Sequence, residues 1–402
     1  MSPTFTLLKN ANLFAPQALG VVDILLAGEQ VAAIEPALSI TGLPGLVTLD
    51  LAGQTVVPGL VDGHVHLIGG GGEGGFATRT PEVTMSKLTT AGVTTVAGLL
   101  GTDCVTRHNA TLYAKTKGLN AEGITAVMFT GGYTVPSRTI TQSIQDDIVF
   151  LDTVVGLKLA ISDHRSSCPS LDELARMVSD ARVAGMVGKK CGRVVVHLGG
   201  ATEGLAPLKA LLEMTDIPIS QFIPTHINRK AFLFEQALEW AQQGGFIDIT
   251  SGINPDIGAK GAIKPSSAFV RCLRAGLDLK RVCISSDGNG SLPLFDDQGT
   301  MIGLGVSGFS SLLETLRELV LHEGIALSDA LMPFTQAPAY ALGLDHCKGR
   351  IAVGMSADLL VLDDNLMLKH TFARGRCMVR DGEAIVRGTF EAQVSFTTAD
   401  SQ

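Results

Sequence analysis

Residues 55–66, TVVPGLVDGHVH, are the stretch that decides the fold, because an apolar run ends here in two histidines. Side chains at positions i and i+2 of a β-strand point to the same face, so His64 and His66 reach one spot where this strand ends. Two imidazoles placed in this way can bind one metal ion. An isolated His-x-His pair carries little weight among the nine histidines of the chain. The other strand ends therefore decide how the pair is interpreted.

Short apolar runs along the middle of the chain predict the strands of a parallel sheet. They are residues 56–62, 93–100, 124–130, 154–161, 194–198, 222–227, 246–250 and 282–286. Segments with helical character separate them, such as 170–184, 204–212, 233–243, 307–322 and 326–341. This alternation favours an α/β fold closed into a (β/α)8 TIM barrel. An open doubly wound sheet would need a glycine-rich loop that opens a helix, whereas the glycines at 69–72 follow the histidines, where we expect the backbone to approach a ligand.

Both ends of the chain alternate like antiparallel strands. Near the N-terminus these are residues 5–9, 22–26 and 31–34, and near the C-terminus 358–362, 371–373, 377–379 and 384–386. Asp381-Gly382 is a typical hairpin turn between the last two. We therefore predict a small β-sandwich domain built from both termini, residues 1–55 and 348–395, beside a catalytic barrel of residues 56–347.

The composition is typical of an enzyme with a large buried core, since 46% of the 402 residues are hydrophobic and 17% are charged. The formal charge of -8 gives no indication of nucleic acid or an anionic membrane as a partner. Seven cysteines without a C-x-x-C pair argue against a disulfide framework and a thiolate zinc site. No signal peptide and no apolar run of about 18 residues is evident, so we expect a cytoplasmic protein.

Residues suited to metal chemistry gather at the predicted strand ends. Imidazole and carboxylate groups are suitable ligands for zinc and similar divalent ions. Lys158 fits such a set only as a carbamate formed with carbon dioxide, because a protonated ammonium cannot bind a cation. Burial beside cations would lower the pKa of this lysine, and its neutral form is the reactive one. The complete set is His64, His66, Lys158, His197, His226 and Asp287.

These segments resemble the amidohydrolase superfamily and, within it, the isoaspartyl (β-aspartyl) dipeptidases. The superfamily resemblance rests on V-x-P-G-x-[VI]-D-x-H-x-H at residues 56–66, together with the lysine, histidines and aspartate on later strands. The closer resemblance covers nearly the whole chain and rests on residues 64–73, 98–103, 133–139, 161–165, 225–229 and 285–291. It implies a hydrolase of β-aspartyl dipeptides with two divalent metal ions, zinc being the expected metal. It also implies a small-molecule dipeptide as partner and a sizeable homo-oligomer, with an octamer as one expectation.

The resemblance also implies a role for each matching residue. His64, His66 and Asp287 would hold one metal, His197 and His226 the second, and carbamylated Lys158 would bridge the two. Asp287 would be the general base and acid, and Tyr133 would polarise the scissile carbonyl. The implied substrate contacts are Glu73 to the ammonium, Gly71, Thr102 and Ser291 to the α-carboxylate, and Arg165 and Arg229 to the C-terminal carboxylate.

The chain departs from the family pattern in two places. Gly199-Gly200 stands where an acidic residue is expected after the His-x-Gly that begins at His197. The segment 254–267 is longer and richer in lysine than the corresponding segment of the family pattern, which would alter how the pocket is covered.

Two other functions stay open on the sequence alone. A cyclic-amide hydrolase of the dihydroorotase or hydantoinase kind would need no clamp for a second carboxylate. A metal-free paralogue with a structural role would be expected to lose metal ligands, whereas this chain has the full set.

Overall fold

The computed structural model describes residues 4–295 and 301–391, and the middle of the chain forms an eight-stranded parallel sheet. The strands are β6 (Leu60–Val65), β7 (Val93–Gly98), β8 (Thr125–Gly131), β9 (Val154–Ile161), β10 (Arg193–Leu198), β11 (Phe222–Thr225), β12 (Ile247–Thr250) and β13 (Val282–Ser285). Each strand pairs in parallel with the next along the chain. A parallel bridge between Val65 and Gly288 brings the two edges together, so the sheet nearly closes. The predicted (β/α)8 barrel is confirmed, and its strands lie in the predicted runs except at the first of them.

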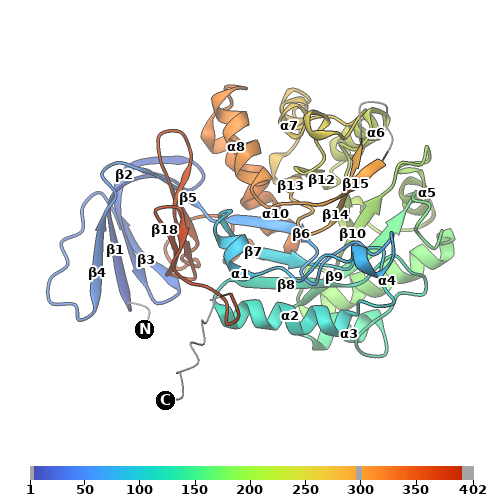
Figure 1. The fold of residues 1–402 in the computed structure, drawn as a ribbon, viewed down its shortest axis with the longest axis horizontal. Coiled ribbons are helices and arrows are strands. Elements are labelled where there is room, and N and C mark those ends of the chain that lie inside the picture. The colour runs from blue at the N-terminus through green and yellow to red at the C-terminus, as the bar shows by residue number, and fades with distance from the viewer. Residues whose placement is uncertain (1–3, 296–300, 392–402) are drawn as a thin grey trace, which may run out of the picture.

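Helices cover the outside of the barrel (Figure 1). They are α1 (Met85–Thr89), α2 (Asn109–Glu122), α3 (Ile144–Phe150), α4 (Leu171–Gly188), α5 (Ala206–Met214), α6 (Ala231–Gln242), α7 (Pro265–Arg274), α8 (Ser311–Leu321) and α9 (Leu327–Leu331). α4 begins with a capping box in which Ser170 and Glu173 satisfy each other's backbone N–H groups. The helix expected over 326–341 is interrupted, because Pro333 lies in a 3-10 turn, Met332–Phe334, between α9 and α10 (Gln336–Leu342).

α10 closes the amino-terminal end of the barrel. Its apolar residues Ala341 and Leu342 pack against strand side chains that point into the barrel, including Phe129 and Ile223. Arg193 donates hydrogen bonds to the carbonyl oxygens of Tyr340 and Ala341 (2.7 and 2.9 Å), which stabilises the last turn of α10. Apolar packing therefore fills this end, and the polar chemistry is left to the carboxyl-terminal end.

Strands from both termini form a second, nine-stranded mixed sheet (Figure 1). They are β1 (Phe5–Phe14), β2 (Ala18–Ala27), β3 (Gln30–Glu35), β4 (Leu46–Asp50), β5 (Thr55–Pro58), β16 (Leu359–Leu362), β17 (Leu368–Ala373), β18 (Arg376–Arg380) and β19 (Glu383–Ala384). Hydrogen bonds join all of them into one sheet, and Leu8, Ile24, Val361 and Phe372 share a buried core. This confirms the small β-domain built from both chain ends.

Gly59 alone separates the two sheets at residues 55–65. The strand predicted over 56–62 is therefore wrong as a single element, because β5 belongs to the mixed sheet and β6 to the barrel. A Cβ atom on Gly59 would lie 2.2 Å from Thr94 Oγ1, so only glycine fits at this crossing. The sequence analysis also did not predict β4 or the hairpin of β14 (Ser291–Phe295) and β15 (Met301–Val306). The domain bounds at residues 55 and 348 stay a prediction.

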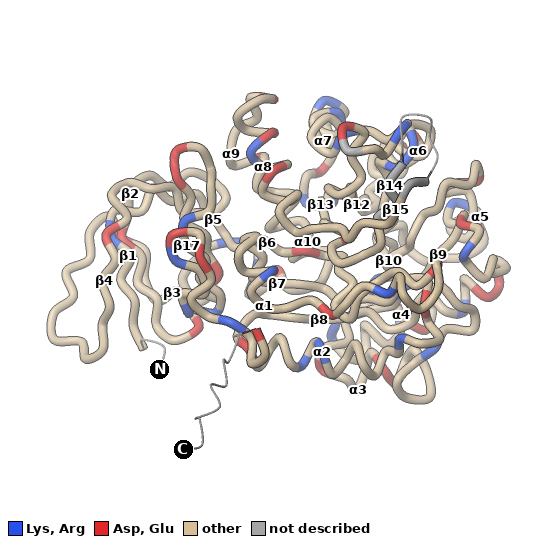
Figure 2. Tube along the Cα trace, viewed as in Figure 1, with Lys and Arg blue, Asp and Glu red and all other residues tan. Residues whose placement is uncertain are grey.

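Positive and negative residues are interspersed along the outer helices and loops in the view of Figure 2. Among the helices of residues 4–295 and 301–391, none combines the length and the hydropathy that a membrane span requires.

Candidate active site at the carboxyl-terminal end of the barrel

One cavity at the carboxyl-terminal end of the barrel brings the predicted site residues together. It is lined by His66, Gly70, Gly71, Glu73, Gly101, Thr102, Tyr133, Arg165, His197, His226, Arg229, Asp287, Gly290 and Ser291. Two predicted residues lie outside this lining, His64 and Lys158, and both are buried. Lys158 Nζ lies 3.4 Å from His64 Nε2, which in turn lies 3.5 Å from Asp287 Oδ1. The two buried residues therefore adjoin the same cavity through Asp287.

His64, His66 and Asp287 form a group that can hold a metal ion, with one ligand atom from each lying within 4.8 Å of the others. His66 Nε2 lies 3.1 Å from Asp287 Oδ1. Burial, reinforced by the charge of Lys158, lowers the pKa of His64 well below its usual value. This imidazole is therefore neutral and keeps a lone pair for a metal. Neutral imidazole and carboxylate are the donor set that divalent zinc accepts, so the residues fit the metal that the family implies.

His197 and His226 lie beside this group, with their ring centroids 4.7 Å apart. His226 Nδ1 is hydrogen-bonded to Thr250 Oγ1 (2.7 Å), and His197 Nε2 to Asp163 Oδ2 (2.8 Å). Each ring thus has one nitrogen engaged by the protein, an arrangement that orients the other nitrogen as a ligand. Burial lowers the pKa of His197 to about 3 and also lowers that of His226.

Lys158 is fully buried in β9, and this burial lowers the pKa of its ammonium to about 7. At neutral pH a large fraction of the side chain is therefore an uncharged amine. That form is compatible with a site for cations and is the one that reacts with carbon dioxide.

Left-handed backbone conformations occur at two of the predicted metal ligands. His226 has φ 65° and Asp287 has φ 54°, a region that residues other than glycine rarely adopt. Each follows the last residue of its barrel strand by one or two positions. Such local strain is concentrated at functional sites, where the surrounding structure maintains it.

Charged side chains form the outer part of the cavity. Arg165 Nη1 lies 3.3 Å from Glu73 Oε1, so the predicted ammonium ligand and one predicted carboxylate ligand are paired with each other. The Arg165 guanidinium lies 5.9 Å from the centroid of the Tyr133 ring. Burial raises the pKa of the Tyr133 phenol above its usual value, which keeps it protonated as a hydrogen-bond donor.

The glycine loop at 69–72 lies at the rim of the cavity, and its backbone conformation there requires glycine. Gly71 has φ 74°, and a Cβ atom on it would lie 2.4 Å from the carbonyl oxygen of Thr78. Gly70 and Gly71 therefore present their backbone to the cavity.

Asp163 is a site residue that the sequence analysis missed. Besides His197, its carboxylate accepts hydrogen bonds from Arg165 Nε (3.0 Å) and Nη2 (2.8 Å). It therefore joins a predicted metal ligand to a predicted substrate clamp. The signal available in the sequence was an aspartate two residues before Arg165 at the end of a barrel strand, but that spacing does not reveal a contact with His197 on the next strand.

The unusual Gly199-Gly200 pair follows His197 after one intervening residue, Leu198. A Cβ atom on Gly199 would lie 2.2 Å from the carbonyl oxygen of Ser162, whereas one on Gly200 would meet nothing within 4 Å. The departure from the family pattern therefore lies at a position with open space, and the contacts of His197 do not depend on it.

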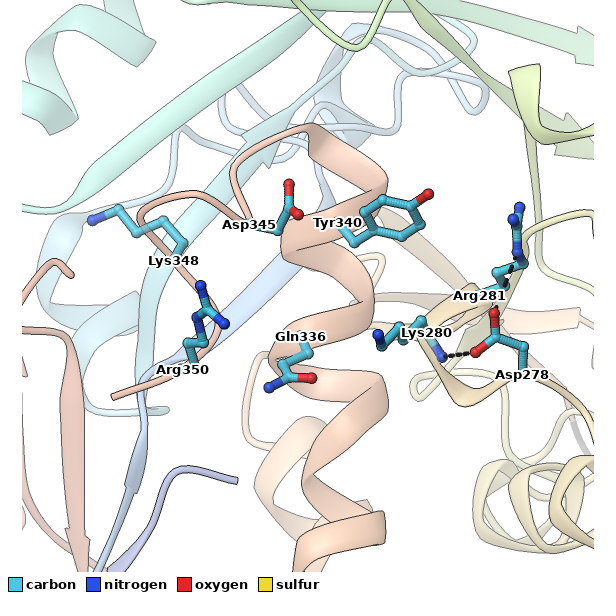
Figure 3. Close-up of a pocket in the computed structure, with 8 residues that line it drawn as sticks. All are labelled: Asp278, Lys280, Arg281, Gln336, Tyr340, Asp345, Lys348 and Arg350. Atoms are coloured by element: carbon cyan, nitrogen blue, oxygen red, sulfur yellow. Dashed lines mark hydrogen bonds and ion pairs between the residues drawn. The ribbon is translucent and has the colours of Figure 1, made fainter. Parts of the chain in front are cut away.

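Figure 3 shows the side chains that line a second cavity, of about 290 Å³. This cavity lies at the opposite end of the barrel. Arg281, which precedes β13, lines it, whereas Asp287 follows that strand. Arg281 is paired there with Asp278 (3.5 Å), and the lining contains none of the predicted metal ligands. This cavity is therefore separate from the candidate active site.

Comparison with known proteins agrees with this geometry. Residues 241–386 match the amidohydrolase family. The crystal structure of beta-aspartyl dipeptidase from the thermophilic keratin-degrading Fervidobacterium islandicum AW-1, in complex with beta-Asp-Leu dipeptide, has 41% sequence identity and a TM-score of 0.86, covering 95% of this chain and 98% of that chain. A structure of D-hydantoinase shares the fold at 18% identity and a TM-score of 0.69, covering 96% and 97% of the two chains.

Imidazolonepropionase of Ruegeria sp. (strain TM1040) is 25% identical over 339 residues, which are 78% of this chain and 79% of that protein. Sequence identity to the beta-aspartyl dipeptidase, at 41%, is higher than this, and the match covers 95% of this chain. The chain therefore belongs to the amidohydrolase family of hydrolases, as a homologue of beta-aspartyl dipeptidase.

Proposed function

We propose that this protein hydrolyses β-aspartyl dipeptides at a metal centre. The observation that carries the proposal is that one cavity holds both the metal-binding group and the side chains of Glu73, Arg165 and Arg229. A β-aspartyl dipeptide has one ammonium and two carboxylates, which this inventory of charges complements. The homologue from F. islandicum in complex with beta-Asp-Leu supports the same substrate class.

The proposed metal centre holds two divalent ions, with zinc as the expected metal. His64, His66 and Asp287 would bind one ion and His197 and His226 the other, with Lys158 as a carbamate between them. The neutral imidazoles and the pKa of about 7 at Lys158 support these assignments. When bound, such ions lower the pKa of water and polarise a carbonyl group.

Two side chains of the cavity would carry the proton and charge transfers. Asp287 would accept the proton of the attacking water on a carboxylate oxygen and then deliver it to the departing amine nitrogen. Tyr133 would donate its phenolic hydrogen to the scissile carbonyl oxygen as negative charge develops there.

The outer charges would set substrate length. Glu73 would bind the ammonium, Arg165 and Arg229 the C-terminal carboxylate, and Gly71, Thr102 and Ser291 the α-carboxylate. Because Glu73 and Arg165 are paired at 3.3 Å, the two charges of the substrate would have to separate them. A ligand with only one of these charges would leave a partner unpaired, so the pair would favour unblocked dipeptides.

The test compares β-Asp-Leu with α-Asp-Leu and with β-Asp-Leu blocked by N-acetylation or C-terminal amidation. Blocking either end leaves a charge of the site unpaired, which costs about 2–5 kcal/mol, or roughly 30- to 4,000-fold in kcat/KM. The α-linked peptide should fail because its carbonyl would miss the metal centre. Similar kcat/KM values for the free and blocked peptides would contradict the proposal.

Hydrolysis of cyclic amides of the dihydroorotase or hydantoinase kind is the alternative function. The likeness to D-hydantoinase, at 18% identity, supports only a shared fold. Arg229→Ala separates the two functions, since a cyclic-amide hydrolase would keep its activity without this clamp.

We also propose that the protein acts as a homo-oligomer in the cytoplasm, with an octamer as one expected size. Exposed apolar residues near the carboxyl-terminal ends of α3 and α4 support a contact between subunits; Phe150, Met186 and Val187 are 75%, 64% and 70% exposed. Sedimentation velocity of the purified protein tests the oligomeric state.

A further inference from the structure

Two buried polar atoms below the metal-binding group lack a hydrogen-bond partner among the described residues. They are Nδ1 of His64 and Oδ1 of Asp248. The two residues are only 1% and 4% exposed, so bulk water does not reach them. Buried polar atoms of this kind are almost always hydrogen-bonded, to protein or to ordered water.

Both residues line the same small cavity inside the barrel. Its volume is about 20 Å³, and its other walls are mostly apolar, including Phe129, Ile223 and Leu342. A cavity of about 10–15 Å³ by this measure holds one water molecule when polar partners are present. The cavity is therefore large enough for one water, and His64 and Asp248 provide the polar partners.

The carboxylate of Asp248 is held firmly by its other oxygen. Oδ2 accepts hydrogen bonds from Thr225 Oγ1 and Ser285 Oγ, both at 2.6 Å, and these come from the strands on either side of β12. The two hydroxyl groups fix the orientation of the carboxylate and leave Oδ1 as the oxygen available to another donor.

We propose that a water molecule in this cavity accepts a hydrogen bond from His64 Nδ1–H and donates one to Asp248 Oδ1. Asp248 is thereby a positioning residue for the metal centre. The bridge keeps the proton of the imidazole on Nδ1, so the lone pair is on Nε2, the atom that lies 3.5 Å from Asp287 Oδ1. A carboxylate that orients a metal-binding histidine in this way raises the affinity for the metal. The inference rests on the proposed function of His64 as a metal ligand.

Asp248→Asn tests the bridge, with Cys283→Ala as the matched control. The asparagine can keep the hydrogen bonds from Thr225 and Ser285, but its amide group offers the water a donor in place of an acceptor. Cys283 lines the same cavity, and its replacement leaves both polar atoms in place. We expect zinc affinity, measured by competition with a chelator, to fall about 10- to 100-fold for Asp248→Asn. The control should bind zinc like the wild-type protein.

A crystal structure of the wild-type protein tests the water bridge without any substitution. Electron density for one water within hydrogen-bond distance of both atoms is the expected result. A dry cavity, or a folded Asp248→Asn protein with unchanged zinc affinity, would overturn the inference. If the wild-type protein bound no divalent metal, the proposed function would fail instead, and the water in the crystal would still test the bridge separately.

Discussion

Replacement of Asp163 by asparagine should weaken both halves of the active site together. The aspartate side chain is 3% exposed and accepts hydrogen bonds from His197 Nε2 and from the guanidinium and backbone N–H of Arg165. All of these partners are donors. The amide nitrogen of the introduced asparagine would therefore face a donor whichever way the side chain is turned.

The expected loss of kcat/KM follows from the hydrogen bonds that each carboxylate oxygen of Asp163 accepts. Oδ2 accepts from His197 and Arg165 at 2.8 Å each, and Oδ1 accepts from Arg165 N and Nε at 2.9 and 3.0 Å. A hydrogen bond to a charged group contributes about 1.5–3 kcal/mol, so losing at least one lowers kcat/KM about 10- to 100-fold.

The assay is hydrolysis of β-Asp-Leu, with KM and zinc content measured on the same preparation. Loss of the Arg165 contact should raise KM, and loss of the His197 contact should lower zinc occupancy. A general loss of folded protein would instead lower the total activity without raising KM. Asp152→Asn is the control, since Asp152 is exposed and paired with Lys117 at the surface. If the Asp163→Asn variant kept its KM, kcat and zinc content within about threefold of wild type, the assigned role of Asp163 would be refuted.

Three further changes test other parts of the molecule. Asp287→Asn should lower kcat at least about 100-fold, because an amide cannot accept the proton of water, and a variant within tenfold of wild type would exclude Asp287 as the base. Lys158→Ala should lose metal and activity together, and short-chain carboxylates should restore part of both; metal binding equal to wild type without them would argue against a carbamate bridge. Lys348→Met should lower the free energy of unfolding by about 3–5 kcal/mol in urea titrations, because it leaves the buried carboxylate of Asp358, now paired at 2.6 Å, without its cation. An unchanged unfolding midpoint would show that this pair does not stabilise the fold.

The order and type of the barrel strands could be predicted from local sequence. Runs such as 154–161 are short, apolar and bounded by polar residues, and a strand buried on both faces has this pattern irrespective of its partners. The placement of His64 and His66 on one face follows from the twofold repeat of a strand in the same way. The alternation near the termini likewise indicated a β-domain from both chain ends before any contact was known.

Contacts between strands were decided only by the tertiary structure. The break at Gly59 depends on how closely Thr94 of the neighbouring strand approaches, and the link from Asp163 to His197 crosses from β9 to β10. The cavity shared by His64 and Asp248 exists because strands far apart in sequence close into a barrel. Local sequence records which faces a strand buries, because that depends on backbone geometry, but it does not record which side chain of another strand stands opposite, because that depends on the closure and register of the whole sheet.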